Sequence, residues 1–363
     1  MFHLTTMDLR ILLCFSFAGG ITFFLIPSIV EMAAKKHLVA EPGSRTSHEK
    51  SVPNLGGIAI FIGFIISYLL FLKTAYFPTF QFLLAGTLML FFVGFKDDIT
   101  HISPFKKFFG QVVAAWIVVS FGGIRITSLY GFFGIYEIQE PLSYMISMIT
   151  VIGITNCFNL MDGIDGLSAG LAILASFTFG TWFYLAGDYD WVILAAGLAG
   201  SLFTFSYFNV FGRSNKIFMG DTGSLTVGFI MSVIAIHFNQ VNLNPTIPNH
   251  IHAAPAVSIG ILMLPIFDTL RVMIFRLARR KSPFDPDKTH IHHHLLDLGL
   301  SHLQATLVLL GISLIFIFTS FLCRNLSVFI CLVILFSMGI FKMLITVYLA
   351  RRKLKKRSAF PNA

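Results

Sequence analysis

Residues 156–186 read NCFNLMDGIDGLSAGLAILASFTFGTWFYLA. A turn rich in Asn, Asp and Gly leads directly into an apolar run of about 20 residues, the length of a helix that crosses a bilayer. Similar runs fill most of the 363-residue chain, which is 56% hydrophobic and 12% charged, with a mean hydropathy of +0.81. Soluble domains usually carry about 25% charged residues. The composition therefore excludes an ordinary soluble domain and a disordered chain, and the unbroken apolar runs exclude an outer-membrane barrel.

The hydropathy predicts an all-α polytopic membrane protein with about eleven transmembrane helices. The loops between them are too short for a separate soluble domain, so residues 1–363 are predicted to form a single integral membrane domain that ends in a basic tail, 350–363. The expected spans are 8–31, 54–72, 80–95, 108–123, 141–157, 167–186, 190–208, 223–238, 254–276, 304–323 and 327–349.

The distribution of basic residues predicts the orientation of these spans. Twenty of the 26 Lys and Arg residues fall in loops after odd-numbered spans or in the tail, and three fall in loops after even-numbered spans. Because cytoplasmic loops are enriched in Lys and Arg, the N-terminus is predicted to lie outside and the C-terminus in the cytoplasm. Four loops that carry acids, basic groups and histidines then share the cytoplasmic face.

The first of these polar segments is 93–111, in which the adjacent carboxylates Asp97 and Asp98 end a span and Lys106 and Lys107 follow. Acidic side chains are unfavourable at a helix C-terminus because the helix dipole is negative there. A divalent cation, or a proton linked to a phosphate, would compensate. The alternative is that the two carboxylates only solvate the helix end.

The second segment is the turn in 156–170. Asp162 and Asp165 lie three residues apart among glycines, and Asn156 and Asn159 precede them. Glycines permit a tight turn and the close approach of a ligand to the backbone. Asn, Asp and bare amides together suit hydrogen bonding to a base, a sugar or a hydrated metal ion, whereas a purely structural turn would not need four such side chains.

In the third segment, 207–229, Asp221 is predicted at the start of a helix and Thr222, Gly223 and Ser224 follow it. One interpretation is a simple N-cap, where Asp is common. The N-terminus of a helix also attracts phosphates, and a carboxylate there could hold Mg²⁺ against them. The two interpretations are compatible.

The fourth segment is 276–301, where basic residues beginning at Arg276 precede PFDPD and the histidines His290, His292, His293 and His294. Histidine tracts can bind transition metals, but no cysteine and no HExxH motif lies nearby. Phosphate contact or proton transfer is therefore favoured, with a zinc site and a solvated loop as alternatives.

Taken together, the segments resemble the polyprenyl-phosphate N-acetylhexosamine-1-phosphate transferases, glycosyltransferase family 4. The motifs PNLGG, KDD, NLMDGIDGL, FMGDTGSL and HIHHHL occur in the family's order between residues 53 and 295. HIHHHL after PFDPD resembles the undecaprenyl-phosphate GlcNAc-1-phosphate transferase branch, which uses UDP-N-acetylglucosamine, rather than the branch that uses the muramoyl-pentapeptide nucleotide.

The resemblance implies that N-acetylglucosamine 1-phosphate passes from UDP-GlcNAc to undecaprenyl phosphate, giving undecaprenyl-diphospho-GlcNAc and UMP and initiating a cell-envelope polysaccharide. It implies Mg²⁺ as cofactor, with Mn²⁺ as an alternative, and an active site on the cytoplasmic face of the bacterial inner membrane. The implied partners are a UDP-N-acetylhexosamine, undecaprenyl phosphate and membrane lipids, without nucleic acid. The oligomeric state, a homodimer included, stays open.

The resemblance also implies roles for individual residues. The metal is expected at Asp221 and Asn159. The expected catalytic residues are Asp97, Asp98, Lys107, His290, His292 and His293. The expected uridine pocket is formed by Asp162, Gly163, Asp165, Asn209 and Phe218. Asn156 and Arg276, from the same polar segments, complete the predicted substrate contacts.

Three alternatives differ from this function. One is a phospho-N-acetylmuramoyl-pentapeptide transferase, and another is a non-catalytic lipid-binding subunit. The third is a secondary transporter, whose ionisable residues would lie near the membrane midplane. Here only Asp268, Arg271 and Lys342 lie inside expected spans away from the span ends. Asp268 and Arg271 are spaced for an i,i+3 ion pair that supports the site.

Overall fold

The computed structural model describes residues 5–36, 38, 52–72, 77–279 and 290–359. Its contacts divide the chain into two compact units. The first comprises Met1–Leu129 and Ile135–His250, and the second comprises Tyr130–Gly134 and Ile251–Ala363. The single domain expected over residues 1–363 stays a prediction.

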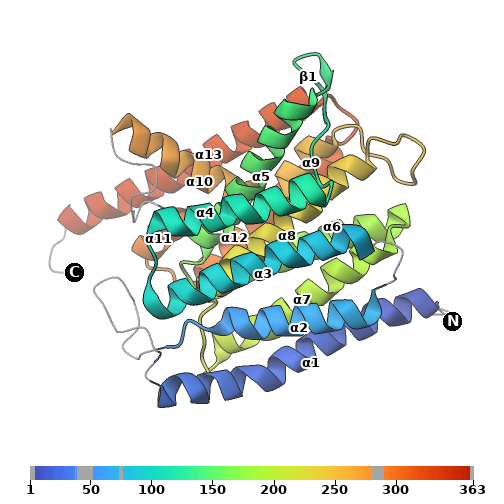
Figure 1. Ribbon diagram of the computed structural model, residues 1–363. Helices are drawn as coiled ribbons and strands as arrows, with labels where there is room; N and C mark the ends of the chain where they lie inside the picture. Colours follow the sequence, from blue (N-terminus) through green and yellow to red (C-terminus); the bar gives the residue numbers. More distant parts are fainter. Residues whose placement is uncertain (1–4, 37, 39–51, 73–76, 280–289, 360–363) are drawn as a thin grey trace. The chain divides into compact units, whose positions relative to one another are not determined.

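Within its described residues, the first unit contains eight α-helices and one π-helical turn (Figure 1). They are α1 (Thr6–Lys35), α2 (Gly56–Phe71), α3 (Phe77–Thr100), α4 (Pro104–Trp116), the π-helical turn η2 (Ile117–Phe121), α5 (Glu140–Met161), α6 (Leu167–Ala186), α7 (Tyr189–Phe211) and α8 (Gly220–Val241).

The described part of the second unit contains five helices. They are α9 (Ala254–Ile261), α10 (Met263–Ala278), α11 (Ile291–Asp297), α12 (His302–Leu322) and α13 (Val328–Ala359). A β-hairpin of β1 (Ser128–Phe132) and β2 (Ile135–Glu137) precedes α5 in the chain.

Eight helices of the described chain are long and apolar enough to cross a membrane. They are Thr6–Lys35, Thr79–Thr100, Glu140–Met161, Leu167–Ala186, Tyr189–Phe211, Gly220–Val241, His302–Leu322 and Val328–Thr346. The prediction of a polytopic, mainly helical membrane protein is confirmed. The count of eleven spans and the orientation of the termini stay predictions.

Helix α8 forms the centre of the first unit, where it packs against α2, α3, α5 and α6. Glycines make two of these approaches possible. A Cβ at Gly57 of α2 would lie 2.6 Å from the Cα of Gly223, and a Cβ at Gly94 of α3 would lie 2.6 Å from the carbonyl carbon of Asp221. Only residues without a side chain let the three helices meet at the start of α8.

The all-α prediction is wrong at the β-hairpin. Its loop residues Phe133 and Gly134 both have positive φ, +53° and +77°, as in the type I′ turn that matches the twist of paired strands. The flanking residues are mainly aromatic and aliphatic, which suits a strand. The hairpin was missed because its strands are only five and three residues long.

The continuous helix expected over 254–276 is also wrong, because α9 and α10 form an angle of 81° at Leu262. Pro265 lies in the first turn of α10. Proline lacks the N–H that would bond the carbonyl of Ile261, and its ring clashes with that carbonyl in a continuous helix. The chain therefore ends one helix and begins another.

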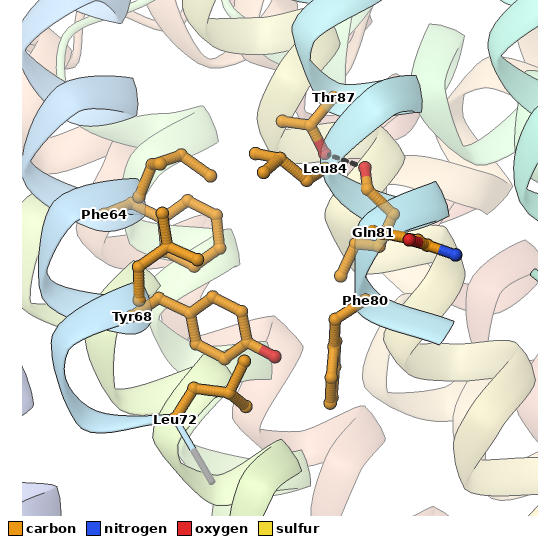
Figure 2. Close-up of a pocket in the computed structure, with 10 residues that line it drawn as sticks. Phe64, Tyr68, Leu72, Phe80, Gln81, Leu84 and Thr87 are labelled. Atoms are coloured by element: carbon orange, nitrogen blue, oxygen red, sulfur yellow. Dashed lines mark hydrogen bonds between the residues drawn. The ribbon is translucent and has the colours of Figure 1, made fainter. Parts of the chain in front are cut away.

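A small apolar cavity of about 90 Å³ lies between α2 and α3. Figure 2 shows Phe64, Tyr68 and Leu72 facing Phe80 and Leu84 across it. These residues come from the last half of α2 and the first half of α3, so the cavity lies at the opposite end of α3 from Asp97 and Asp98.

Candidate active site

Asp98 fixes the N-terminus of α8 from the last turn of α3. Its carboxylate accepts hydrogen bonds from the backbone N–H groups of Asp221 (2.8 Å) and Thr222 (2.9 Å) and from the Thr222 hydroxyl (2.5 Å). Gly220 precedes this turn with φ +70°, and a Cβ there would lie 2.7 Å from the Asp98 carboxylate. A carboxylate that satisfies N-terminal N–H groups stabilises a helix, so Asp98 sets the position of Asp221.

The ammonium of Lys107 lies between two carboxylates. Its Nζ is 2.8 Å from Asp221 Oδ2, 3.4 Å from Asp97 Oδ2 and 3.3 Å from Asn159 Oδ1. The Asn159 amide group also donates to Asp221 Oδ1 and, at 2.8 Å, to the Ser224 hydroxyl. The structure therefore brings together four predicted site residues from α3, α4, α5 and α8, with Ser224 beside them.

The oxygens of this cluster suit Mg²⁺. Mg²⁺ is typically bound by one or two carboxylates together with waters and substrate phosphates, and Asp221 and Asp97 supply two carboxylates beside the Asn159 amide. In the described part of the chain, no group of three or more His, Cys, Asp or Glu side chains is arranged to hold a metal ion. Beyond the carboxylates of Asp221 and Asp97, a divalent ion there would therefore take its other ligands from neutral oxygens and from phosphate.

The glycine-rich turn after α5 is held by Asn209 of α7. The Asn209 amide oxygen accepts from the N–H of Gly166 at 2.6 Å, and its amide nitrogen donates to the carbonyl of Ile217 at 2.9 Å. Asn209 is buried. Asn209 therefore joins the glycine-rich turn to the segment before α8. Its expected contact with the nucleotide stays a prediction.

Asp165 forms an ion pair with Lys216, whose Nζ lies 2.7 Å from Asp165 Oδ2. Lys216 also lies 5.8 Å from the centre of the Phe218 ring. Two residues of the expected uridine pocket, Asp165 and Phe218, therefore both lie beside Lys216. Gly163 is exposed on the same turn as Asp165.

Asp162 follows α5 directly. Burial raises the pKa of its carboxyl group to about 8, and the nearby carboxylates of Asp221, Asp98 and Asp165 act in the same direction. A carboxyl that keeps its proton at neutral pH can donate a hydrogen bond as well as accept one.

The PNLGG segment runs beside the chain that leads into α8. Phe218 donates its N–H to the Pro53 carbonyl at 2.8 Å, and its own carbonyl accepts from Gly56 at 2.9 Å. Gly57 donates to the Met219 carbonyl at 2.9 Å. These bonds fix the backbone on which Phe218 lies.

Asn156 has a structural partner that was not predicted. Its amide nitrogen donates to Gln111 Oε1 at 2.6 Å, and Gln111 donates back to Asn156 Oδ1 at 3.1 Å. Gln111 is buried. This reciprocal pair joins α4 to α5 and so supports the placement of Lys107 and Asn159 on those helices.

In the second unit, the histidines lie at the start of α11. His290 and His292 are buried, and their rings stack with centroids 5.7 Å apart. The ring of His293 lies 4.3 Å from that of His292. Burial lowers the pKa of His292 to about 3, and the neighbouring His293 and His290 lower it further, so His292 is neutral at physiological pH.

The predicted ion pair inside the second unit is confirmed, since Arg271 Nη2 lies 2.8 Å from Asp268 Oδ1. Arg276 is buried on the last turn of α10. The PFDPD motif and the basic residues 280 and 281 lie outside the described residues.

Sequence reasoning did not predict several contacts that position the predicted residues. They are the hydrogen bonds Gln111–Asn156, Thr222–Asp98, Asn159–Ser224 and His290–Asp268 and the ion pair Lys216–Asp165. The partners of each contact are distant in the chain, so spacing alone carried no signal.

Comparison with known proteins identifies the family. The family described as Glycosyl transferase family 4 matches residues 80–239. A probable undecaprenyl-phosphate N-acetylglucosaminyl 1-phosphate transferase of Bacillus subtilis is 30% identical over 93% of this chain and 91% of its own length. The chain belongs to glycosyl transferase family 4. The predicted family, and its branch, are confirmed.

Further members of glycosyl transferase family 4 show the same similarity. Proteins named undecaprenyl-phosphate alpha-N-acetylglucosaminyl 1-phosphate transferase are 32% identical in Pasteurella multocida, over 77% of this chain and 76% of that protein, and 28% identical in Yersinia pestis, over 84% and 80%. The region that matches the family, residues 80–239, contains Asp97, Lys107, Asn159 and Asp221.

Proposed function

We propose that the protein transfers N-acetylglucosamine 1-phosphate from UDP-GlcNAc to undecaprenyl phosphate, releasing UMP and initiating a cell-envelope polysaccharide. The observation that carries this proposal is the cluster of Asp97, Lys107, Asn159 and Asp221 in a member of glycosyl transferase family 4. Relatives named for this transfer match 76–93% of the chain. A membrane protein can bind a lipid acceptor from the bilayer. The cluster lies at the ends of α3, α4, α5 and α8, where a nucleotide donor could enter from the water phase.

The chain's own residues position the charges of a phosphoryl transfer. An oxygen of the lipid phosphate attacks the sugar-linked phosphorus, and the bond from that phosphorus to the bridging oxygen breaks, so that UMP leaves. Asp97 Oδ2 accepts a hydrogen bond from a lipid phosphate that still carries its proton, since Asp97 Oδ1 already accepts from the N–H of Ile102 at 2.7 Å. A phosphomonoester has a second pKa near ~6, so little proton transfer to Asp97 is needed. Lys107 supplies positive charge to the phosphates.

Mg²⁺, with Mn²⁺ as an alternative, is proposed as the cofactor. Asp221 and Asn159 would hold it, with Ser224 and Asp97 at the margin of the site. When bound, such an ion neutralises the charge that develops on phosphate oxygens.

The experiment that tests the proposed function is transfer of radiolabel into an organic-soluble lipid. Purified protein, undecaprenyl phosphate and Mg²⁺ are combined with UDP-GlcNAc, UDP-GalNAc, the UDP-muramoyl-pentapeptide, ADP-glucose or GDP-mannose. We expect transfer from UDP-GlcNAc and none from the ADP- and GDP-sugars. Transfer from the muramoyl-pentapeptide nucleotide instead would favour the other branch, and uptake into vesicles without lipid labelling would favour a transporter.

The uridine pocket gives a prediction of its own. Asp165→Ala should raise the KM for UDP-GlcNAc by about 10- to 100-fold, because a hydrogen bond to a charged group contributes about 1.5–3 kcal/mol. The KM for undecaprenyl phosphate should change less. Steady-state kinetics with each substrate varied in turn measures both constants. If only the lipid KM rose, the glycine-rich turn would belong to the lipid phosphate site.

We also propose eleven crossings, with the N-terminus outside, the C-terminus and the site in the cytoplasm, and the bacterial inner membrane as the location. Three segments would join the eight long apolar helices. They are α2, about 24 Å long at 1.5 Å per residue, α4 continued by η2, about 27 Å long, and the bent pair α9–α10. In unit 1, the site residues lie at alternate ends of successive helices, which supports this alternation.

Cysteine labelling in intact cells tests the topology. We expect Asn325→Cys to react with a membrane-impermeant maleimide, and Ser214→Cys to react only after permeabilisation. Both positions are exposed, whereas the native cysteines Cys14, Cys157, Cys323 and Cys331 are buried and should give little background. Labelling of position 214 from outside would reverse the orientation.

A further inference from the structure

The carboxylate of Asp268 anchors the start of the histidine tract. It is 1% exposed. Its Oδ2 lies 2.9 Å from His290 Nδ1, and the N–H of Ile291, the first residue of α11, lies 3.2 and 3.3 Å from its two oxygens. The Oδ1 side accepts from Arg271 Nη2 at 2.8 Å and Nε at 3.2 Å. One side chain of α10 thus joins a histidine ring, a helix start and a guanidinium group.

This arrangement determines which nitrogen of His290 carries a proton. The ion pair with Arg271 keeps Asp268 in its charged form, and an ionised carboxylate only accepts hydrogen bonds. His290 Nδ1 must therefore be the donor. In the neutral ring, Nε2 is then the nitrogen with the lone pair, and in the protonated ring Nε2 is the remaining donor.

We propose that Asp268 is a positioning residue for the transfer reaction, which fixes the ring and the Nδ1–H form of His290 and so leaves Nε2 as the nitrogen that can act on a substrate phosphate. The inference rests on the proposed function for its chemistry, but the protonated nitrogen can be measured without any substrate. His292 cannot take this part, because it is neutral and buried, and within the described chain its Nδ1 has no hydrogen-bond partner.

Asp268→Asn gives the sharpest test. Arg271 and Ile291 only donate, so the single amide oxygen of the substituted side chain should turn toward them and its NH₂ group toward His290. The NH₂ group requires a lone pair on Nδ1, which forces the proton of His290 to Nε2. We expect kcat to fall by about 10- to 100-fold, as when an outer partner of a functional histidine is lost, with the KM values changed less.

The proton position can be read by ¹⁵N–¹H correlation spectra of histidine-labelled protein in nanodiscs, with the His290 signals assigned by their loss in His290→Gln. We expect Nδ1–H in the wild type and Nε2–H in Asp268→Asn. Nε2–H in the wild type would overturn the proposal, and this spectrum decides the question even if Asp268→Asn does not fold.

A double-mutant cycle separates positioning from general support of the fold. If Asp268 acts through His290, the double variant Asp268→Asn/His290→Gln should be no slower than His290→Gln alone. Multiplicative losses would overturn the proposal. Asp297→Asn changes an exposed acid on the same helix α11 and should leave kcat unchanged. If the wild type transferred no sugar phosphate at all, the proposed function would fail while the spectra still tested the contact.

Discussion

Asp221→Asn should abolish detectable turnover, with kcat lowered on the order of 10³-fold. The substitution keeps the shape of the side chain but replaces an anionic oxygen by an amide. Removal of one group that stabilises transition-state charge typically costs about 2.7–4 kcal/mol, and here the proposed metal would also be bound more weakly. The half-saturating concentration of Mg²⁺ should rise. Both quantities follow from radiolabel transfer measured at increasing Mg²⁺.

The matched control is Glu137→Gln, which neutralises an exposed carboxylate on β2 outside the cluster and should retain the activity of the wild type. Asp221→Asn should still fold, because the Asp98 carboxylate bonds the backbone of residue 221 and not its side chain. Turnover and Mg²⁺ dependence equal to those of the wild type in Asp221→Asn would remove Asp221 from the metal site.

The helices could be predicted because a span is a local property of the sequence. About 20 consecutive apolar residues form a helix in a membrane because a helix satisfies the backbone hydrogen bonds within the segment. Most expected spans lie within α1 to α8, α12 and α13. The break at Leu262 was also encoded locally, in Pro265, but hydropathy does not register backbone hydrogen bonds. The strands of the hairpin, five and three residues long, are too short for their sequence pattern to be distinguished from that of a loop.

The candidate site was predictable as a set of residues but not as a set of contacts. Asp98 and Asp97 are neighbours in the chain and were given the same role, yet Asp98 accepts bonds from the backbone of α8 while Asp97 faces Lys107. Adjacent side chains point in different directions around a helix, so Asp97 and Asp98 meet different partners. Asp221, the partner of Asp98, lies more than 120 residues away in the chain. Similarly, Asn209 was expected in the uridine pocket, and the hydrogen bond that it accepts from Gly166 was not predicted.

Lys107→Met should give the second large effect, and its metal dependence should change in the opposite direction to that of Asp221→Asn. Methionine fills a similar volume without charge. The ammonium of Lys107 is 2.8 Å from Asp221 Oδ2 and 3.4 Å from Asp97 Oδ2, so it competes with a divalent ion for the same oxygens. Its loss should lower the half-saturating concentration of Mg²⁺. Turnover at saturating Mg²⁺ should nevertheless fall by about 10²-fold, because a cation beside the reacting phosphates is lost.

Lys106→Met is the control for this prediction, since Lys106 is the exposed neighbour of Lys107 on α4 and should leave both quantities unchanged. The same titration of transfer against Mg²⁺ compares all the variants. If Lys107→Met required more Mg²⁺ than the wild type, Lys107 would assist metal binding and would not compete with it. If its turnover were unchanged, the cation would serve only to hold Asp97 and Asp221 together in the absence of substrate.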